Sequence, residues 1–272
     1  MKHSLTTLEF AQMMEEIAPL QAACEWDNSG LVLDLGIAVK KILVCLDVTN
    51  AVIDEAAAGG FDTIVSHHPP VFAPARQFSI ADPTGRRLIR SIQCGLNLYA
   101  AHTSYDAAPD SGMSMVLGRQ IGLYDLSPLQ IEKRALDGSV IGAIGAIGHL
   151  QSPMSVNAFA EHIKKVLGVP CLRAAGSRAS IFTVACMGGA AGEYIHAAAE
   201  HGADAFLVGE VKHHHYEQAN SIGIVLFEAG HYDTEAVFVQ EVCHDLQKRA
   251  DALEYAIEIC GSVASGRPYV VM

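Results

Sequence analysis

Histidines and carboxylates gather at four places in this chain, and each place directly follows a short apolar run. At the first, His67 and His68 come after the apolar residues 63–65 and before Pro69 and Pro70. The prolines prevent a simple continuation of a strand, and adjacent side chains of an extended backbone point in different directions. The two imidazoles are therefore candidates to bind two different metal ions. The alternative is a pair of surface histidines on a loop.

Two further pairs have the four-residue spacing that places side chains on one side of a helical turn. Asp106 is a natural oxygen ligand, and His102 is either a ligand or a group that holds a ligand in place. His231 and Glu235 stand at the opening of a long amphipathic segment, so a helix there would give them a common face. An ordinary loop or helix cap is the alternative for both pairs.

The fourth group follows the apolar residues 205–209 and contains Glu210, His213 and two more histidines. Glu210 is a candidate for proton transfer or for supporting a ligand, and His213 is a candidate proton carrier. The alternative is a polar loop.

Five side chains form the predicted ligand set of a two-metal centre: His67, His68, Asp106, His231 and Glu235. If one carboxylate bridges two ions, each ion receives three protein ligands and keeps positions open for water, as a catalytic site requires. Mixed imidazole and carboxylate donors suit Zn, Fe, Mn, Co or Ni. We therefore expect two divalent metal ions whose identity is not determined by the sequence.

Short apolar strands alternate with helices, a pattern typical of an α/β fold with largely parallel sheets flanked by helices. Ligands gather at the carboxyl ends of parallel strands, so this fold would bring the four groups together. Strands are expected at residues 41–48, 63–65, 96–101, 139–147, 182–186, 205–209, 224–227 and 255–259. Helices are expected at residues 5–19, 51–58, 85–93, 114–121, 156–167, 194–201, 214–220 and 234–253.

Residues 124–137 are more polar and interrupt this rhythm. We therefore predict two α/β domains, residues 1–128 and 129–272, with the C-terminal segment able to pack back on the first domain.

Composition narrows the class of protein. The net charge of −12 argues against binding to nucleic acid. The seven cysteines occur singly, as buried free thiols in a reducing cytoplasm would. Because the N-terminus lacks the apolar core of a signal peptide and no apolar run reaches ~18 residues, we expect a cytoplasmic protein with no membrane span.

Two other features favour ordinary packing. Residues 188–192 are rich in glycine and could hold a phosphate, but they lack the P-loop and GxGxxG patterns, so a tight turn is favoured. Trp26 is the only tryptophan, and its default position is in the core.

Five motifs occur in an order that resembles a known family: WDNSGL, SHHPP, AHTSYD, GEVKHH and GHYDTE. The chain resembles the hexameric dinuclear-metal proteins known as GTP cyclohydrolase type 2 homologues, or Nif-three-like proteins. The resemblance implies two similar α/β domains with the metal pair in the cleft between them, and a homo-hexamer that is a trimer of dimers. It also implies the same five ligands, with His102 and Glu210 beside them.

The resemblance and the donor set together favour a metal-dependent hydrolase acting on a nucleotide or a related ring or phosphate substrate, such as the purine ring of GTP. Glu210, His102 and His213 are its candidate proton carriers. The alternative is a non-enzymatic metal-binding scaffold, metal chaperone or regulatory adaptor.

Overall fold

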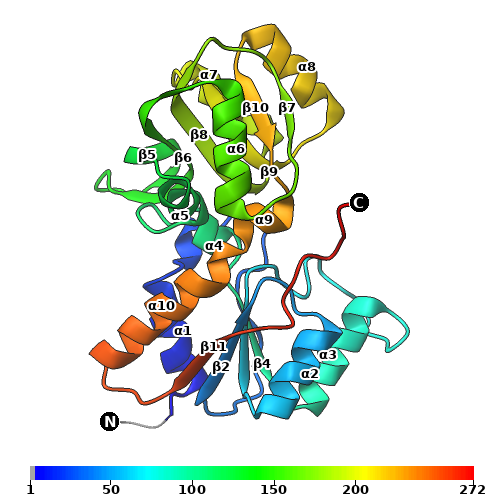
Figure 1. Cartoon of the computed structure of the whole chain (residues 1–272). Coiled ribbons are helices and arrows are strands. Elements are labelled where there is room, and N and C mark those ends of the chain that lie inside the picture. The colour runs from blue at the N-terminus through cyan, green and yellow to red at the C-terminus, as the bar shows by residue number, and fades with distance from the viewer. Residues whose placement is uncertain (1–3) are drawn as a thin grey trace. The chain divides into compact units, whose positions relative to one another are not determined.

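The computed structural model describes residues 4–272. Its alternating strands and helices form two separate sheets, each flanked by helices (Figure 1). The chain divides into two compact units. Unit 1 contains the described residues up to Tyr105 together with Phe238–Gly266, and unit 2 contains Asp106–Val237 and Arg267–Met272. The prediction of two α/β halves with mixed sheets and flanking helices is confirmed.

The sheet of unit 1 has five strands in the order β1-β4-β3-β2-β11. The strands β11, β2, β3 and β4 run parallel, and β1 is antiparallel to β4. Their bounds are β1 Gly30–Leu33, β2 Lys41–Cys45, β3 Thr63–Ser66, β4 Asn97–Ala100 and β11 Glu258–Gly261. β2, β3 and β4 are almost completely buried, because helices cover both of their faces.

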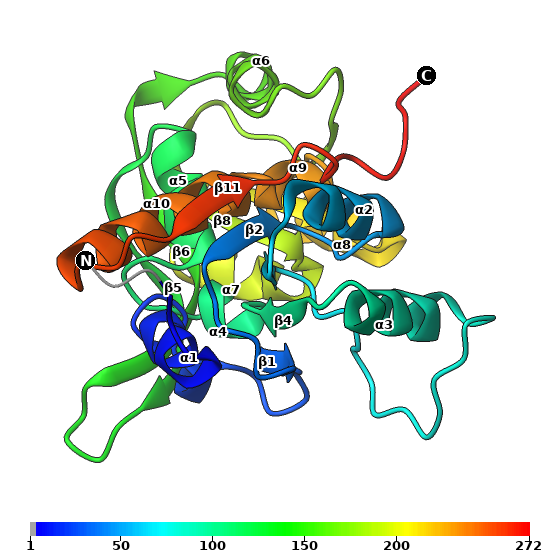
Figure 2. The ribbon, with the colours of Figure 1, turned by 90° about the horizontal axis from the view of Figure 1, so that it is seen from below.

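Helices α2 and α3 lie on one side of this sheet, and α1 and α10 lie on the other, as Figures 1 and 2 both show. Their bounds are α1 Thr7–Glu15, α2 Asn50–Gly59, α3 Pro83–Gln93 and α10 Val237–Ala252. A capping box fixes the start of α1, because Thr6 and Glu9 exchange side-chain and backbone hydrogen bonds. Two short helices follow in the chain's connections: η1 (Leu20–Ala22) and α4 (Thr103–Asp106), whose last residue belongs to unit 2.

One carboxylate ties α2 to the segment that follows β11. Glu55 accepts hydrogen bonds from the Ser262 hydroxyl and from the backbone N–H groups of Val263 and Ala264, the latter two at 3.0 Å. Burial alone raises the pKa of Glu55, but these three hydrogen bonds outweigh it and hold the pKa below its usual value.

The sheet of unit 2 has six strands in the order β5-β6-β8-β9-β10-β7. The central strands β8, β9 and β10 are parallel, whereas β5, β6 and β7 join antiparallel. The strand bounds are β5 Tyr124–Arg134, β6 Val140–Met154, β7 Arg173–Ala175, β8 Ile181–Ala190, β9 Ala205–Glu210 and β10 Val225–Glu228. The helix bounds are α5 Met113–Gln120, α6 Val156–Leu167, η2 Gly192–Tyr194, α7 Ile195–Glu200, α8 His213–Ile222 and α9 His231–Glu235.

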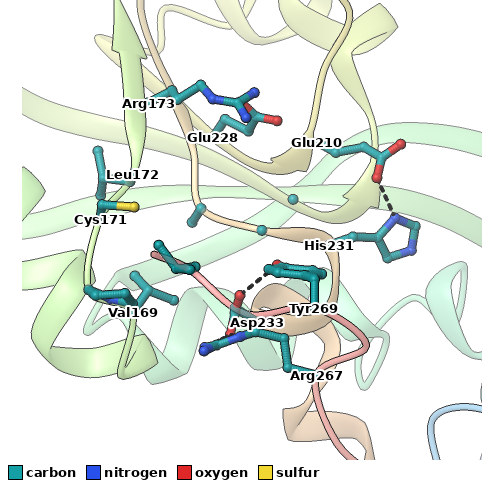
Figure 3. A pocket seen from close by; sticks show the side chains of 15 residues that line it. Val169, Cys171, Leu172, Arg173, Glu210, Glu228, His231, Asp233, Arg267 and Tyr269 are labelled. Atoms are coloured by element: carbon teal, nitrogen blue, oxygen red, sulfur yellow. Dashed lines mark hydrogen bonds and ion pairs between the residues drawn. The ribbon is translucent and has the colours of Figure 1, made fainter.

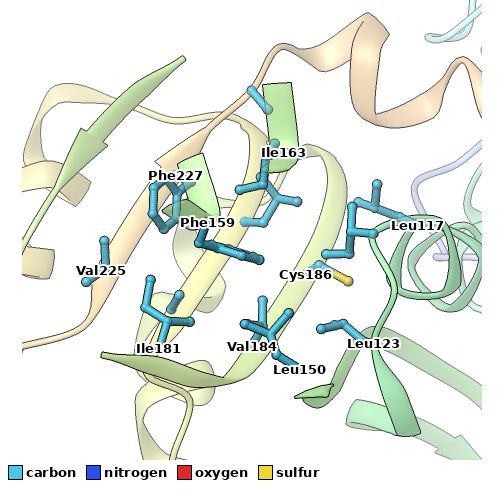
Figure 4. Close-up of a cluster of buried hydrophobic side chains, with 14 of the residues drawn as sticks. Leu117, Leu123, Leu150, Phe159, Ile163, Ile181, Val184, Cys186, Val225 and Phe227 are labelled. Carbon is cyan, nitrogen blue, oxygen red and sulfur yellow. The ribbon is translucent and has the colours of Figure 1, made fainter. Parts of the chain in front are cut away.

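Alternate residues of β8 supply two separate cores in unit 2, because successive strand side chains point to opposite faces. Val184 and Cys186 pack with Phe159 and Ile163 of α6, as Figure 4 shows. Ala185 and Met187 face the opposite core with helices α7 and α8. Burial raises the pKa of the Cys186 thiol to about 12, so this cysteine is the inert buried thiol that the sequence indicated.

The polar segment that suggested a domain boundary contains strand β5, and the proposed division after residue 128 lies inside it. β5 is polar because it is an edge strand that pairs with β6 alone. The chain instead passes from one compact unit to the other after Tyr105, after Val237 and after Gly266. Among the described residues, no helix is both long and apolar enough to cross a membrane.

Candidate metal centre

Three histidines of unit 1 lie together beyond strands β3 and β4. His67 and His68 directly follow Ser66, the last residue of β3, and His102 comes two residues after the end of β4. Because β3 and β4 are parallel neighbours, their carboxyl ends share one edge of the sheet. One ligand nitrogen from each of the three imidazoles lies within 4.8 Å of the others. Three imidazoles at this separation can hold a divalent transition metal.

The hydrogen bonds of His67 and His68 orient both rings for metal binding. Nδ1 of His67 lies 2.9 Å from the carbonyl oxygen of Ala101, and Nδ1 of His68 lies 2.9 Å from a carboxylate oxygen of Asp47. Both oxygens act as acceptors, so each neutral ring carries its proton on Nδ1 and keeps a lone pair on Nε2. Metal-ligating histidines commonly have this kind of support.

His102 is held in the same way, by a carboxylate that the sequence analysis did not single out. Asp27 accepts from Nδ1 of His102 at 2.8 Å, from the backbone N–H of Thr103 at 3.0 Å, and from the hydroxyls of Thr103 and Ser29, each at 2.6 Å. Burial by itself raises the pKa of Asp27, but the hydrogen bonds from His102, Ser29 and Thr103 outweigh it and hold the pKa far below its usual range. Asp27 is therefore a charged anchor for His102.

The tryptophan beside Asp27 is not in the core, so the default interpretation of Trp26 is wrong. Its side chain is 59% exposed and lies against the rings of Phe72 and His102. The signal that could have identified this loop was the joint presence of an aromatic residue and an acid within the WDNSGL motif.

His231 and Glu235 come together in unit 2, on helix α9. Their spacing brings Nε2 of His231 within 3.2 Å of a carboxylate oxygen of Glu235, whose side chain is buried. Nδ1 of His231 lies 3.2 Å from Glu210, the last residue of β9 (Figure 3). With the proton on Nδ1 facing Glu210, Nε2 of His231 and the Glu235 carboxylate form a pair of adjacent metal donors.

The glycine-rich segment at residues 188–192 lies against His231 and Glu235. β8 continues to Ala190, so residues 188–190 belong to a strand and are not the tight turn that the sequence favoured. A Cβ at Gly189 would lie 2.3 Å from Oε1 of Glu235 and 3.3 Å from Nε2 of His231. Gly189 also has φ of +65°, which side chains rarely adopt. A glycine is needed here because the carboxylate of Glu235 occupies the space of a side chain.

The remaining candidates occupy different positions. Asp106 ends helix α4, is half-buried, and is the first residue of unit 2. His213 is exposed at the first residue of α8. His215 is buried and accepts a hydrogen bond at Nδ1 from the backbone N–H of Lys212 at 3.1 Å, so it caps the helix. The histidine run thus has a structural member that sequence reasoning did not recognise.

A cavity of about 350 Å³ lies in unit 2, with His231 and Glu210 in its wall (Figure 3). The C-terminal segment forms part of the same wall through Arg267 and Tyr269, which both bind the carboxylate of Asp233. The opposite wall is mostly apolar and comes from residues that follow α6. A small molecule in this cavity would contact the His231 imidazole.

Comparisons with known proteins cover nearly the whole chain. The Duf34/NIF3 family (NGG1p interacting factor 3) matches residues 5–268. Relatives from Deinococcus radiodurans (31% identical, 85% of each chain covered) and Allochromatium vinosum (31% identical, 86% of this chain and 89% of the relative) are both called GTP cyclohydrolase 1 type 2 homolog. A hypothetical protein of Staphylococcus aureus superposes with a TM-score of 0.92 at 25% identity, covering 98% of this chain and 99% of that one. A Bacillus cereus protein related to NIF3 superposes with a TM-score of 0.91 at 23% identity, with the same coverage.

Proposed function

The chain belongs to the Duf34/NIF3 family, and from that premise we propose that it binds two divalent metal ions and acts as a metal-dependent hydrolase. The proposed substrate is a nucleotide or a related ring or phosphate compound. One observation carries the proposal: protein acceptors hold Nδ1 of both His67 and His68, as is common for metal-ligating histidines, and one ligand nitrogen of each lies within 4.8 Å of one from His102.

The proposed ligands come from both units of the chain and are those expected from the motifs: His67, His68, Asp106, His231 and Glu235. The residues fit a metal by their chemistry. Each unit contributes imidazole or carboxylate donors that already carry supporting hydrogen bonds, and this donor set suits Zn, Fe, Mn, Co or Ni.

When bound, two such ions supply Lewis-acid activation of water and of the electrophilic atom of a substrate. The chain's own groups supply proton transfer and orientation. His102, held at Nδ1 by the carboxylate of Asp27, is a proposed proton carrier beside these ligands. Glu210 holds the tautomer and orientation of His231. His213, exposed at the start of α8, stays a predicted proton carrier.

The support for an enzyme over a metal store is the cavity beside His231. Its volume of about 350 Å³ is within the range of small-molecule sites. Its wall combines apolar residues with polar side chains that could orient a small ligand: Arg173, Glu210, Glu228, His231, Asp233 and Arg267.

The metal content of the purified protein tests the centre directly. Elemental analysis of metal-reconstituted protein should find two ions per chain, and His68→Ala and Glu235→Gln should each lower that number. His201→Ala is the matched control, because His201 is an exposed histidine directly after α7 that makes its own hydrogen bond to the carbonyl oxygen of Ala197. Substoichiometric metal that is unchanged by His68→Ala would refute the dinuclear centre.

A substrate screen on the reconstituted protein tests the reaction. Nucleotides, phosphodiesters and small cyclic amides should be compared with an Asp106→Ala control, and GTP should be checked for release of formate and a ring-opened product. Full metal content without turnover of any compound would favour the scaffold, chaperone or adaptor function instead. The proposal includes assembly as a homo-hexamer, a trimer of dimers, which light scattering of the intact protein measures.

A further inference from the structure

An exposed aromatic pair lies beside the histidine cluster of unit 1. Trp26 is 59% exposed and Phe72 is 54% exposed, although aromatic side chains of this size normally bury most of their surface. Their ring centroids are 5.6 Å apart with an interplanar angle of 35°. Both rings also contact the imidazole of His102, at centroid distances of 6.0 Å and 5.7 Å. The two rings therefore present apolar faces to solvent directly beside a candidate metal ligand.

The two loops that carry these rings are fixed to each other and to His102. Asp27, next to Trp26, holds both His102 and Thr103. The side-chain amide of Asn28 donates to the carbonyl oxygen of Val71 at 2.7 Å, immediately before Phe72. This network orders the rings before any ligand arrives, so binding on them would not carry the entropic cost of ordering a loop.

A cavity of about 240 Å³ lies at the same place and is lined by residues 25–28 and 71–74. Its wall includes Trp26 and Phe72, together with Glu25, whose side chain is exposed. An aromatic surface stacks on planar rings, and a carboxylate accepts from N–H groups at the ring edge. The chemistry of the cavity thus fits a planar nitrogen heterocycle that carries N–H donors.

We infer that Trp26 and Phe72 form a stacking platform for the heterocyclic ring of the substrate, beside His102. The inference rests on the proposed function for the role of the metal centre, and it adds the ring-binding residues and the class of ring. The platform would place the ring beside the imidazole of His102, whose Nδ1 is held by Asp27. Binding would then be specific for compounds with a planar base and insensitive to the sugar phosphate alone.

Trp26 is the only tryptophan in the chain, so its fluorescence reports on this platform alone. Guanosine 5′-monophosphate added to the full-length protein should quench the indole emission saturably, whereas ribose 5-phosphate, which lacks the ring, should leave it unchanged. Phe72→Leu should weaken the quenching titration about 10-fold, the effect of losing one ring from a stacked base. Phe78→Leu is the matched control: Phe78 is exposed on the same connection but does not line this cavity, and its titration should equal that of the unchanged protein.

Equilibrium dialysis provides a second measurement that does not depend on the fluorophore. Trp26→Leu should lose guanosine 5′-monophosphate binding, and Trp26→Phe, which keeps a ring, should retain most of it. Equal quenching by ribose 5-phosphate, or no quenching by the nucleotide, would overturn the platform.

Metal content measured on the same samples separates this inference from the proposed function. Loaded protein that shows no ring-dependent quenching would refute the platform and leave the metal centre standing. Protein that takes up no metal on reconstitution but shows ring-dependent quenching would support the platform and refute the metal centre. Indole emission that changes with protein dilution and not with ligand would identify the aromatic pair as a contact between copies of the chain, which also overturns the inference.

Discussion

Replacing Asp27 by asparagine should weaken both the fold and the metal centre, because this one carboxylate supports a whole loop. Its side chain is 0% exposed. One oxygen accepts from the Thr103 backbone, the Thr103 hydroxyl and the Ser29 hydroxyl, and the other accepts from His102 and from the backbone N–H of Asn28. Asn has only one acceptor oxygen, so its NH₂ must face either the N–H of Thr103 or the N–H groups of His102 and Asn28. The Thr103 and Ser29 hydroxyls can turn to accept from an NH₂ group, so at least one hydrogen bond is lost in either orientation of the amide, together with the charge that strengthens the others.

The size of the effect follows from that lost bond. A hydrogen bond to a charged group contributes about 1.5–3 kcal/mol, so we expect Asp27→Asn to lower the free energy of unfolding by about 2 kcal/mol. The loss of support for a metal-ligating or metal-adjacent histidine typically lowers metal affinity about 10–100-fold. Asp47→Asn is the matched control. Asp47 supports His68 with one bond, but its side chain is 46% exposed, so its loss should cost less than about 1 kcal/mol of stability.

Two measurements test this reasoning. Urea unfolding of the metal-free proteins gives the stability change, and titration against a competing chelator gives the metal affinity. Asp27→Asn should change both, and Asp47→Asn should change mainly the affinity. The reasoning is refuted if Asp27→Asn leaves the unfolding free energy within about 0.5 kcal/mol of the unchanged protein, or if the two variants cannot be distinguished.

Three further outcomes follow from single side chains. The hydrogen bonds to Glu55 lower its pKa, so its carboxylate stabilises the fold above pH ~4.3 and loses that effect as the pH falls through the folded pKa. Glu55→Gln should therefore reduce the fall of the unfolding free energy with decreasing pH. Gly189→Ala should displace Glu235 and lower metal content, while Gly168→Ala, at a similar positive φ but with open space around it, should cost only about 1–2 kcal/mol of backbone strain and leave metal content unchanged. Arg267→Ala should speed the removal of C-terminal residues by carboxypeptidase, followed by mass spectrometry, and equal rates would contradict the role of its ion pair.

Local sequence patterns predicted a helix or strand well where the signals for that element lie within or directly beside its own residues. The helix expected at residues 156–167 is α6 with the same bounds, because a serine cap and a terminal glycine mark its ends. The pairing of His231 with Glu235 was also predictable, since four-residue spacing within a helix brings two side chains together whatever the rest of the chain does. The long helix expected over 234–253 instead follows a separate short helix, α9, and starts at Val237.

The sequence by itself determined which residue types could bind metal, and it placed His67, His68 and His102 after two apolar strands. Only the tertiary structure decided what supports them. Asp27 lies 75 residues from His102, Gly189 makes room for a carboxylate on a distant helix, and β11 pairs with β2 after the chain has built the other unit. Each of these contacts depends on the order of strands in a sheet or on a distant segment that packs back on an earlier one. Hydrophobic periodicity predicts none of them, because it indicates only which face of an element is buried. Local sequence therefore identified the candidate ligands, whereas long-range pairing selected the groups that orient them.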